Sequence, residues 1–354
     1  MDLKKYLTVC GEKIDLFLDN FFLQEKISAE KISPIASQMM QIYREYLRGG
    51  KKARGGLVSL GYECASGINK EVAVQAGAVV EILHSFLLIH DDWIDQDAVR
   101  RGKPTVHKQY EAFFKKQSWK GDGEHWAAGM SVILGDAGCF LAQKILAKMP
   151  CDAELKAKAS VLLSDYLLKT AYGENLDISY DFDSNKSYED ILKVKELKTA
   201  YYTVVMPLSL GAILGGASED KLKAIEEFGL PVGIAFQLRD DELGLFGDQE
   251  TLGKSNKSDL VEGKKTMLIL KALENLTGED KNFLLTIWGK KEANEEEVKK
   301  AKELIVNSQA LNYSQETARS LVEKGKKAIS RITDNPNSQQ ILLSFADFVI
   351  MRNS

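Results

Sequence analysis

The run HSFLLIHDDWID at residues 84–95 ends the most informative segment of the sequence. From Glu71 to Asp95, apolar residues recur every three or four positions, which is the spacing of an α-helix with a buried face. Within 84–95, six apolar or aromatic side chains lie among the polar ones. This segment is therefore predicted to be a long helix that is buried except for the polar groups near its end.

These polar groups fall on one face of the predicted helix. Asp91 and Asp95 are four residues apart, so they lie within about 40° of each other, and His84, seven residues before Asp91, shares their face. Two carboxylates one turn apart repel each other unless a cation lies between them. Oxygen ligands suit a hard ion such as Mg²⁺, which shares its coordination with substrate phosphates. The alternative for this segment alone is a helix that enters an acidic loop with solvated aspartates.

Helical periodicity continues along most of the chain. Apolar residues keep the same spacing in Ala153–Tyr172 and Lys221–Asp241, and so does the Lys/Glu-rich part from about Glu279 to Ser354. Only 6 of the 354 residues are proline, the strongest helix breaker, and convincing strand alternation is absent. We therefore predict an all-α fold, with residues 1–354 forming one large helical bundle and a single domain.

Polar interruptions mark the expected loops of this bundle. They lie at about 114–124, 180–187 and 247–264. Ser187, with Asp190 three residues on, fits an approximate capping box, so a helix is predicted to begin there.

Charge and cysteine content exclude several classes of protein. The net charge of −4 gives no basic surface for a nucleic acid. Neither a membrane span nor a signal peptide is expected, because no run of roughly 18 apolar residues occurs and Met1–Asn20 lacks an uninterrupted apolar core. The four cysteines are scattered, without a CxxC pair or a Cys/His cluster. A cytoplasmic protein is the simplest expectation.

A second acidic cluster ends another apolar helix far along the chain. In the run FQLRDDELG at 236–244, Gln237 lies one helical turn before Asp241, and Asp240 lies beside it. Helical bundles build metal sites from side chains that project inward from facing helices. We expect the two acidic clusters to face each other, with a diphosphate bridged to both by metal.

Basic residues accompany the two clusters. Arg100 and Arg101 follow the first cluster, and adjacent arginines beside carboxylates suit anionic oxygens held through metal. A separate basic patch, GKKAR, lies at 50–54, and Lys198-Thr199 lies in another helical segment. Alone, each of these two would be an ordinary exposed basic group. Together with the acidic clusters, the basic residues indicate two diphosphate sites, one that works with metal and one without it.

At this point the chain resembles the trans-isoprenyl diphosphate synthases, or polyprenyl synthetases. The match runs in order from about Gly49 to Thr266. Its motifs are GKKAR at 50–54, HSFLLIHDDWID at 84–95, RRGKPTVH at 100–107, LGDA at 134–137, LDI at 176–178, KTA at 198–200, FQLRDD at 236–241, LGK at 252–254 and SDLVEGKKT at 258–266. The DDxxG form of the second cluster and the short first motif are most similar to archaeal-type geranylgeranyl and farnesyl diphosphate synthases.

The resemblance implies a bundle of the isoprenoid synthase type, with two or three Mg²⁺ ions in a central active-site cavity. Asp91 and Asp95 would bind metal from one side and Asp240 from the other. Asp92 and Asp241 would act behind these ligands, and Lys198 would complete the catalytic set. The residues implied for isopentenyl diphosphate are Lys51, Arg54, His84 and Arg101. Those implied for the allylic diphosphate are Arg100, Lys198, Thr199, Gln237, Lys254 and Lys264.

The chain departs from the family pattern at three positions. Glu174 stands where glutamine is usual, Gly55 follows the arginine of GKxxR where proline is common, and Trp93 replaces a smaller aliphatic residue. None of the three removes a metal or diphosphate ligand, but Glu174 changes the polarity near the reacting carbons.

The resemblance implies a head-to-tail prenyltransferase that adds isopentenyl diphosphate to dimethylallyl, geranyl or farnesyl diphosphate and works as a homodimer. An apolar tunnel would set product length. The family often places the tunnel floor five residues before the first aspartate, here Phe86, whereas an ideal helical wheel puts Leu87 and Leu83 nearer the Asp91 face.

The product that this pattern resembles most is geranylgeranyl diphosphate, with farnesyl and geranylfarnesyl diphosphate as alternatives. Two other classes remain open. A class I terpene cyclase needs no second diphosphate site, and a non-catalytic subunit of a heteromeric synthase usually lacks aspartates that this chain keeps.

Overall fold

The structure is a computed structural model that describes residues 2–183, 187–247 and 258–352. Within these ranges its regular secondary structure is helical apart from one short hairpin, so the all-α prediction is confirmed. The chain divides into two compact units, which are described separately: unit 1 is Met1–Val161 with Leu210–Ala217, and unit 2 is Leu162–Ser209 with Ser218–Ser354. The expectation of a single domain over residues 1–354 remains a prediction.

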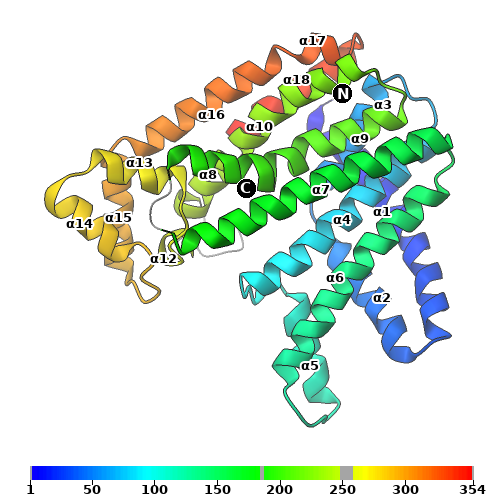
Figure 1. Cartoon of the computed structure of the whole chain (residues 1–354), viewed down its shortest axis with the longest axis horizontal. Coiled ribbons are helices and arrows are strands. Elements are labelled where there is room, and N and C mark those ends of the chain that lie inside the picture. The colour runs from blue at the N-terminus through cyan, green and yellow to red at the C-terminus, as the bar shows by residue number, and fades with distance from the viewer. Residues whose placement is uncertain (1, 184–186, 248–257, 353–354) are drawn as a thin grey trace. The chain divides into compact units, whose positions relative to one another are not determined.

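Unit 1 is built around α4 (Lys70–Ile94), the helix predicted from Glu71 to Asp95. Val72, Ile82 and most other apolar side chains of α4 are buried, which accounts for their dense spacing in the sequence. The helices around it are α1 (Leu3–Glu30), α2 (Pro34–Leu47), α3 (Ala53–Cys64), α5 (Val106–Lys116) and α6 (Gly123–Lys148), with the start of α7 (Ala153–Asp181) and the end of α9 (Met206–Leu214). α1, α2, α3, α5 and α6 all pack against α4 (Figure 1).

A hairpin after α4 returns the chain to the end of that helix. β1 (Val99–Arg100) pairs antiparallel with β2 (Lys103–Pro104). The turn residues Arg101 (φ 51°) and Gly102 (φ 71°) both have positive φ, as the tightest hairpin turns require. Strands of two residues are too short to show alternation, which is why the sequence did not predict them. The hairpin brings Arg100 within bonding distance of Asp92.

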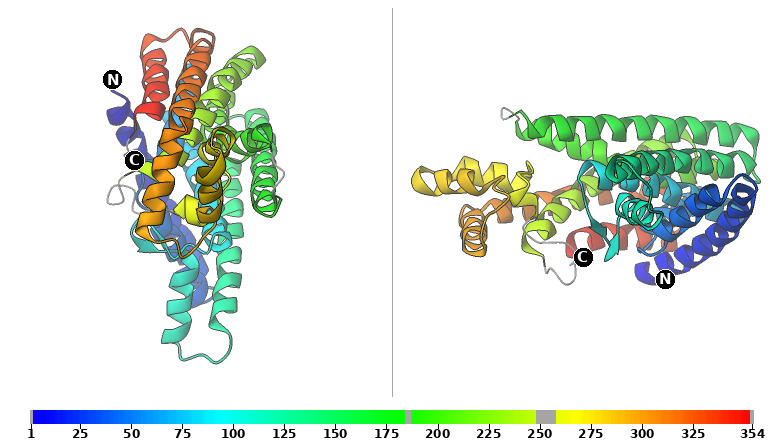
Figure 2. Two further views of the ribbon diagram at one scale, coloured as in Figure 1. Left: turned by 90° about the vertical axis from the view of Figure 1, so that its left-hand side faces the viewer. Right: turned by 90° about the horizontal axis from the view of Figure 1, so that it is seen from below.

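The loop predicted at about 114–124 joins α5 to α6. Figure 2 shows α5 running beside the first part of α6. Trp119 in the connection lies edge-on to Trp126 of α6, with ring centroids 5.3 Å apart, and Phe113 and Phe114 of α5 pack on the same tryptophans. The connection is shorter than predicted, because α5 ends at Lys116 and α6 begins at Gly123.

Unit 2 is centred on α10 (Glu219–Phe246), which contains the predicted helix Lys221–Asp241. The other elements are the rest of α7, α8 (Tyr188–Lys195), η1 (Glu196–Val205), α12 (Ser258–Val261), α13 (Met267–Asn275), α14 (Gly278–Ile287), α15 (Glu295–Asn307), α16 (Ala310–Lys326), α17 (Ile329–Ile332) and α18 (Pro336–Met351). η1, α16, α17 and α18 pack against α10, and α16 runs alongside it (Figure 1). The helical C-terminal part predicted from Glu279 is confirmed.

The capping box predicted at Ser187 is present. Asp190 N–H donates to Ser187 Oγ at 3.2 Å, and Ser187 N–H donates to the Asp190 carboxylate at 2.9 Å. α8 starts there and continues into η1, a π-helix of 10 residues. π-helices are rare and often lie at functional sites. Lys198 and Thr199 lie in this π-helix.

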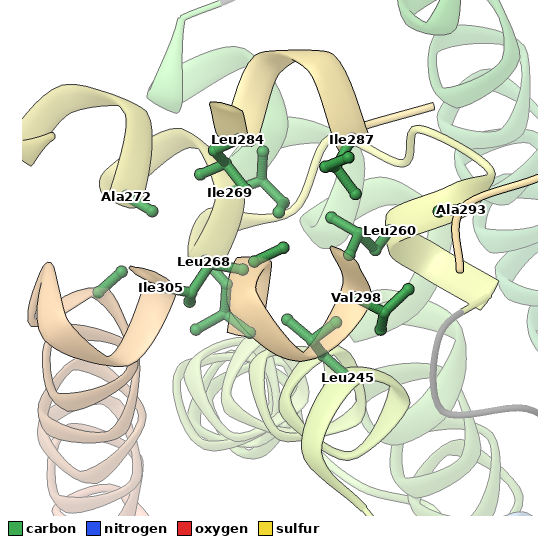
Figure 3. Packing of buried hydrophobic residues seen from close by; sticks show 12 residues of the cluster. Leu245, Leu260, Leu268, Ile269, Ala272, Leu284, Ile287, Ala293, Val298 and Ile305 are labelled. Atoms are coloured by element: carbon green, nitrogen blue, oxygen red, sulfur yellow. The ribbon is translucent and has the colours of Figure 1, made fainter. Parts of the chain in front are cut away.

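A small core of its own lies within α12 to α15 of unit 2. Leu260, Leu268, Leu284 and Ile305 meet there, joined by Leu245 of α10 (Figure 3). Apolar burial of this kind stabilises the segment that follows the second acidic cluster.

Three helices of the described ranges are long and apolar enough to cross a membrane by length and composition alone: Lys70–Ile94, Gly123–Lys148 and Tyr188–Leu214. In their most apolar windows, 72%, 44% and 83% of the residues are buried inside the protein. Burial within the fold accounts for the apolar character of the first and third, and the absence of a membrane span remains a prediction.

Candidate active site

The first acidic cluster, Asp91, Asp92 and Asp95, lies at the C-terminal end of α4 in unit 1. Asp95 is the C-cap, and its N–H donates to the Asp91 carbonyl oxygen at 2.8 Å. Asp92 is fully buried, whereas Asp95 is exposed and the Asp91 side chain is 25% exposed. The two aspartates that the spacing placed on one face are therefore the accessible ones, and Asp92 is enclosed by protein.

Two side chains hold the buried carboxylate of Asp92. Tyr46 Oη donates to Asp92 Oδ2 at 2.7 Å, and Arg100 Nε donates to Oδ1. Burial and the Asp92 charge raise the pKa of Tyr46 well above its usual range, so its hydroxyl stays a proton donor. Arg100 Nη2 also donates to Asp91 Oδ2 at 3.1 Å. One arginine thus bridges both aspartates and fixes the end of α4.

Arg54, His84 and Arg101 gather in unit 1, as the prediction of a metal-free diphosphate site requires. Arg54 Nη1 lies 3.3 Å from His84 Nε2. The Arg101 guanidinium lies over Gly50, where an added Cβ would be 3.3 Å from Arg101 Cζ. Burial, with Arg54 and Arg101 nearby, lowers the pKa of His84 well below its usual range, so the imidazole is neutral. Lys51, the fourth predicted member, is exposed just before α3.

The two lysines of GKKAR differ in their surroundings. Lys52 has a positive φ of 46° and is buried. Its Nζ donates to the carbonyl oxygens of Leu47 and Gly49. Lys52 therefore supports the loop, which leaves Lys51 as the lysine presented to solvent.

The second acidic cluster, on α10 in unit 2, also combines a buried aspartate with an accessible one. Asp241 is buried, and its carboxylate accepts from Gln237 Nε2 at 2.9 Å and from Lys195 Nζ. The Asp240 side chain is 49% exposed and forms an ion pair with Arg352. The predicted proximity of Gln237 and Asp241 is confirmed, and the amide holds the aspartate itself.

Lys198 of η1 is held by two carboxylates of α7. Its Nζ lies 2.6 Å from Asp177 Oδ2 and 3.0 Å from Glu174 Oε2. Gly173 allows this approach, because a Cβ there would lie 2.3 Å from the Lys198 backbone nitrogen. Glu174, where glutamine is usual, therefore places an extra negative charge on Lys198. Thr199, the next residue of η1, is half-buried.

Lys264 lies just after α12 in unit 2. Its Nζ is 3.3 Å from Glu262 Oε2, and its carbonyl oxygen accepts from Trp288 Nε1 at 3.2 Å. These contacts fix the backbone at Lys264. Lys254, the other lysine predicted for the allylic diphosphate, lies outside the described residues.

Three residues that bind the acidic clusters were not predicted from the sequence. Tyr46 holds Asp92, Lys195 holds Asp241 and Arg352 holds Asp240. A single tyrosine, lysine or arginine carries no local pattern that identifies its partner. The one available signal was the position of Lys195, three residues before Lys198 in the same helical run.

The accessible carboxylates fit Mg²⁺ that arrives with a diphosphate. Among the residues that the structure describes, no three His, Cys, Asp or Glu side chains form a group that could hold a metal alone. Mg²⁺ commonly uses one or two carboxylates, keeps several waters and takes further oxygens from substrate phosphates. The first cluster offers two such carboxylates, Asp91 and Asp95, and the second cluster offers one, Asp240.

The residues predicted to set product length lie on α4 before the first acidic cluster. Leu83 is buried, whereas Phe86 and Leu87 are half-buried. The Phe86 ring meets the His90 imidazole edge-on, with centroids 5.0 Å apart. Leu83 is thus fixed in the core, and Phe86 and Leu87 retain some accessible surface.

Comparison with known proteins gives a consistent result. The family model for polyprenyl synthetase matches residues 36–305. A geranylgeranyl diphosphate synthase of Methanosarcina mazei is 33% identical over 304 residues, 86% of each chain. A geranylfarnesyl diphosphate synthase of Aeropyrum pernix is 31% identical over 309 residues, 86% of this chain and 91% of that protein. The crystal structure of geranylgeranyl pyrophosphate synthase from Corynebacterium glutamicum, complexed with isoprenyl diphosphate and magnesium, matches with a TM-score of 0.91 and 30% identity, covering 99% of this chain and 100% of that one.

Proposed function

The chain belongs to the polyprenyl synthetase family, and from this premise we propose that it is a Mg²⁺-dependent trans-prenyltransferase that adds isopentenyl diphosphate to allylic diphosphates. Dimethylallyl, geranyl and farnesyl diphosphate would be the successive acceptors. The product would be a short-chain all-trans prenyl diphosphate.

One observation carries this proposal. Each acidic cluster combines a buried, fixed aspartate with an accessible one: Asp92 with Asp91, and Asp241 with Asp240. A side chain held rigidly beside a metal ligand helps to orient that ligand. This arrangement supports a role of the two clusters in binding metal and diphosphate, since solvated aspartates of a helix end would need no such support.

We propose Asp91, Asp95 and Asp240 as the metal ligands, for two or three Mg²⁺ ions. When bound, Mg²⁺ would neutralise the charge that develops on the departing diphosphate. The magnesium and isoprenyl diphosphate in the Corynebacterium glutamicum structure support the use of Mg²⁺ together with a diphosphate.

The isopentenyl diphosphate would be held without metal by Lys51, Arg54, His84 and Arg101. Two guanidinium groups and an ammonium supply charge, and guanidinium groups bind phosphate oxygens through paired N–H donors. A neutral His84 can donate one N–H without adding repulsion between the cations.

The allylic diphosphate would be held by Arg100, Lys198, Thr199, Gln237, Lys254 and Lys264. Arg100 and Lys198 pair with carboxylates in this structure, so the diphosphate would compete with Asp91 and Asp177 for them. Cations fixed around the leaving group stabilise the charge that appears when the allylic C–O bond ionises.

The remaining steps need no dedicated side-chain base. The isopentenyl double bond attacks the allylic carbon, a new C–C bond forms, and a proton leaves to the released diphosphate. Water must be kept from the allylic cation, and the apolar residues of α4 before Asp91 serve that purpose.

Geranylgeranyl diphosphate is the proposed main product. The name of the Methanosarcina mazei relative supports this length, and that of the Aeropyrum pernix relative keeps geranylfarnesyl diphosphate as an alternative. Farnesyl diphosphate is the shorter alternative. Phe86, with Leu87 and Leu83, would set the limit.

Incubation with isopentenyl and dimethylallyl diphosphates, followed by chromatography of the dephosphorylated products, tests the proposal. Elongated all-trans prenyl alcohols are expected. A cyclic hydrocarbon would instead indicate a terpene cyclase, and no product would indicate a non-catalytic subunit.

We further propose a cytoplasmic homodimer of single-domain chains. Light scattering should then give twice the chain mass of 39.4 kDa.

A further inference from the structure

We propose that Arg352 is a counter-ion of Asp240 that metal must displace, so that loading of the second acidic cluster releases the end of the chain. The inference rests on the proposed function, in which Asp240 is a metal ligand. It assigns a role in metal binding to Arg352, which lies far along the chain from the metal-site motifs.

The end of the chain is anchored beside the second acidic cluster through its backbone. α18 ends at Met351, and the carbonyl oxygen of Arg352 accepts from Arg239 Nε and Nη2 at 3.1 and 3.0 Å. Arg239 Nη1 donates to Glu242 Oε2 at 2.9 Å. Because Arg239 precedes Asp240 on α10, these bonds bring the Arg352 side chain to that aspartate.

The Arg352 guanidinium is itself held on three sides. Nη2 donates to Asp240 Oδ1 and to the Phe236 carbonyl oxygen, the latter at 3.2 Å. Cζ lies 3.8 Å from the centroid of the Phe236 ring, a cation–π contact. The Arg352 side chain is only 9% exposed. A delocalised cation therefore already balances the charge of Asp240.

This arrangement is nevertheless incomplete, which makes it exchangeable. Arg352 Nε is buried and has no hydrogen-bond partner within the described ranges. A buried N–H without a partner costs free energy. The Asp240 carboxylate stays 49% exposed, so a metal ion carrying a diphosphate can reach it from solvent.

Metal and Arg352 compete because two cations beside one carboxylate repel each other. Reciprocity requires that bound metal weakens the Arg352 contact by the same factor that the contact weakens metal binding.

A second ion pair on α10 serves for comparison. Arg331 of α17 binds Glu227 of α10, and both side chains are exposed. Glu227 lies thirteen residues before Asp240, so Arg331→Gln is the control for loss of an arginine that pairs with α10 away from the acidic cluster.

The test measures Mn²⁺ binding by electron paramagnetic resonance of the free ion, without substrate, in an Asp91→Asn background that weakens the first cluster. Arg352→Gln is expected to bind Mn²⁺ about three- to tenfold more tightly, the effect of removing one nearby charge. Arg352→Lys keeps the charge and should match the parent, and so should Arg331→Gln. Equal or weaker binding by Arg352→Gln would overturn the proposal.

Asp240→Asn separates this inference from the proposed function. If Asp240→Asn binds Mn²⁺ as the parent does, Asp240 is no ligand, and the metal assignment fails together with the inference. If Asp240→Asn weakens binding while Arg352→Gln leaves it unchanged, only the counter-ion role is wrong.

The wild-type protein supplies a second test that does not depend on the folding of a variant. Trypsin cleaves after arginine only when the side chain can enter its pocket. Saturating Mg²⁺ with inorganic pyrophosphate should therefore speed removal of the last two residues, Asn353 and Ser354, as read from the intact mass. Cleavage after Arg352 at an unchanged rate would contradict release of the chain end.

Discussion

The two acidic clusters share one arrangement but are supported by different parts of the chain. In unit 1, the buried Asp92 is held by Tyr46 and Arg100, and the same Arg100 also binds Asp91. In unit 2, the two aspartates pair with two different cations: Lys195 holds the buried Asp241, and Arg352 binds Asp240. The first cluster shares one cation between two carboxylates, whereas the second gives each carboxylate its own.

This difference has consequences for stability and for coupling. Arg100 lies eight residues after Asp92, on a hairpin that follows α4 directly, so the first cluster is mostly local. The second cluster joins α8, α10 and the C-terminal end, which meet only through tertiary packing. We therefore expect the first cluster to tolerate the loss of one charge better than the second.

Metal removal should have the largest effect, because it acts on both clusters at once. Exhaustive chelation is expected to abolish condensation of isopentenyl and dimethylallyl diphosphates, since neither cluster can then share the diphosphate charge. Return of Mg²⁺ should restore the activity, which is measured as prenyl product formed per enzyme. Full turnover without a divalent ion would refute the mechanism for both clusters.

Asp241→Asn and Asp92→Asn test the difference between the clusters directly. Asp241→Asn leaves the buried Lys195 ammonium without its carboxylate and should lower the free energy of unfolding by about 3 kcal/mol. In Asp92→Asn, Arg100 keeps Asp91 at 3.1 Å and Asp97 at 3.6 Å, so a loss of roughly 1 kcal/mol is expected.

Urea unfolding of the two variants gives these free energies. Both changes should also lower activity by about 10- to 100-fold, as for residues that orient metal ligands. Equal destabilisation by the two substitutions would mean that the sharing of Arg100 does not protect the first cluster.

Arg54→Ala probes the diphosphate site that is proposed to work without metal. Loss of a charge-assisted phosphate contact costs roughly 1.5–3 kcal/mol, so KM for isopentenyl diphosphate should rise about ten- to hundredfold. KM for the allylic diphosphate should change far less. Lys51→Ala should behave in the same way, and steady-state kinetics with each substrate varied provides the measurement. An equal rise in both KM values would end the division into two diphosphate sites.

Phe86→Ala should have the smallest effect on rate and act on product length instead. Removal of the ring five residues before Asp91 leaves room for a longer chain, so products should lengthen by at least one isoprene unit while Mg²⁺ dependence is kept. Leu83→Phe should shorten the products or slow the last addition, because the larger ring would overlap the growing chain. Overpacking this buried position also costs about 1–3 kcal/mol of stability. Chromatography of dephosphorylated products distinguishes these cases. If Leu87→Ala lengthens the products and Phe86→Ala does not, the helical-wheel placement holds and Phe86 is not the floor.

The sequence was sufficient for the elements that depend on local periodicity. α4 and α10 follow from apolar residues at helical spacing, and Ser187 with Asp190 marks the start of α8. The placement of Asp91 and Asp95 on one face of α4 follows from the same argument, because four residues make about one turn. Each of these features is set by neighbours in the chain.

Other features depend on partners distant in sequence and could not be predicted. Tyr46 lies 46 residues from Asp92, and Arg352 lies 112 residues from Asp240. The π-helix at Glu196–Val205 has no sequence period of its own that distinguishes it from an α-helix. The hairpin around Arg101 is too short to show alternation.

The small core of α12 to α15 gives one part of unit 2 a hydrophobic centre of its own, so we expect that part to unfold locally. Of its buried members, Leu245 belongs to α10 and Ala310 to α16, while the others come from the segment between Leu260 and Ile305. Segments with their own core open as cooperative units at a lower free energy than the whole protein. Since Trp288, the residue after α14, donates a hydrogen bond to the Lys264 backbone, each opening would also withdraw Lys264. The apparent affinity for the allylic diphosphate would then fall with the closed fraction of this segment, so a substitution in the small core could weaken binding without touching a ligand.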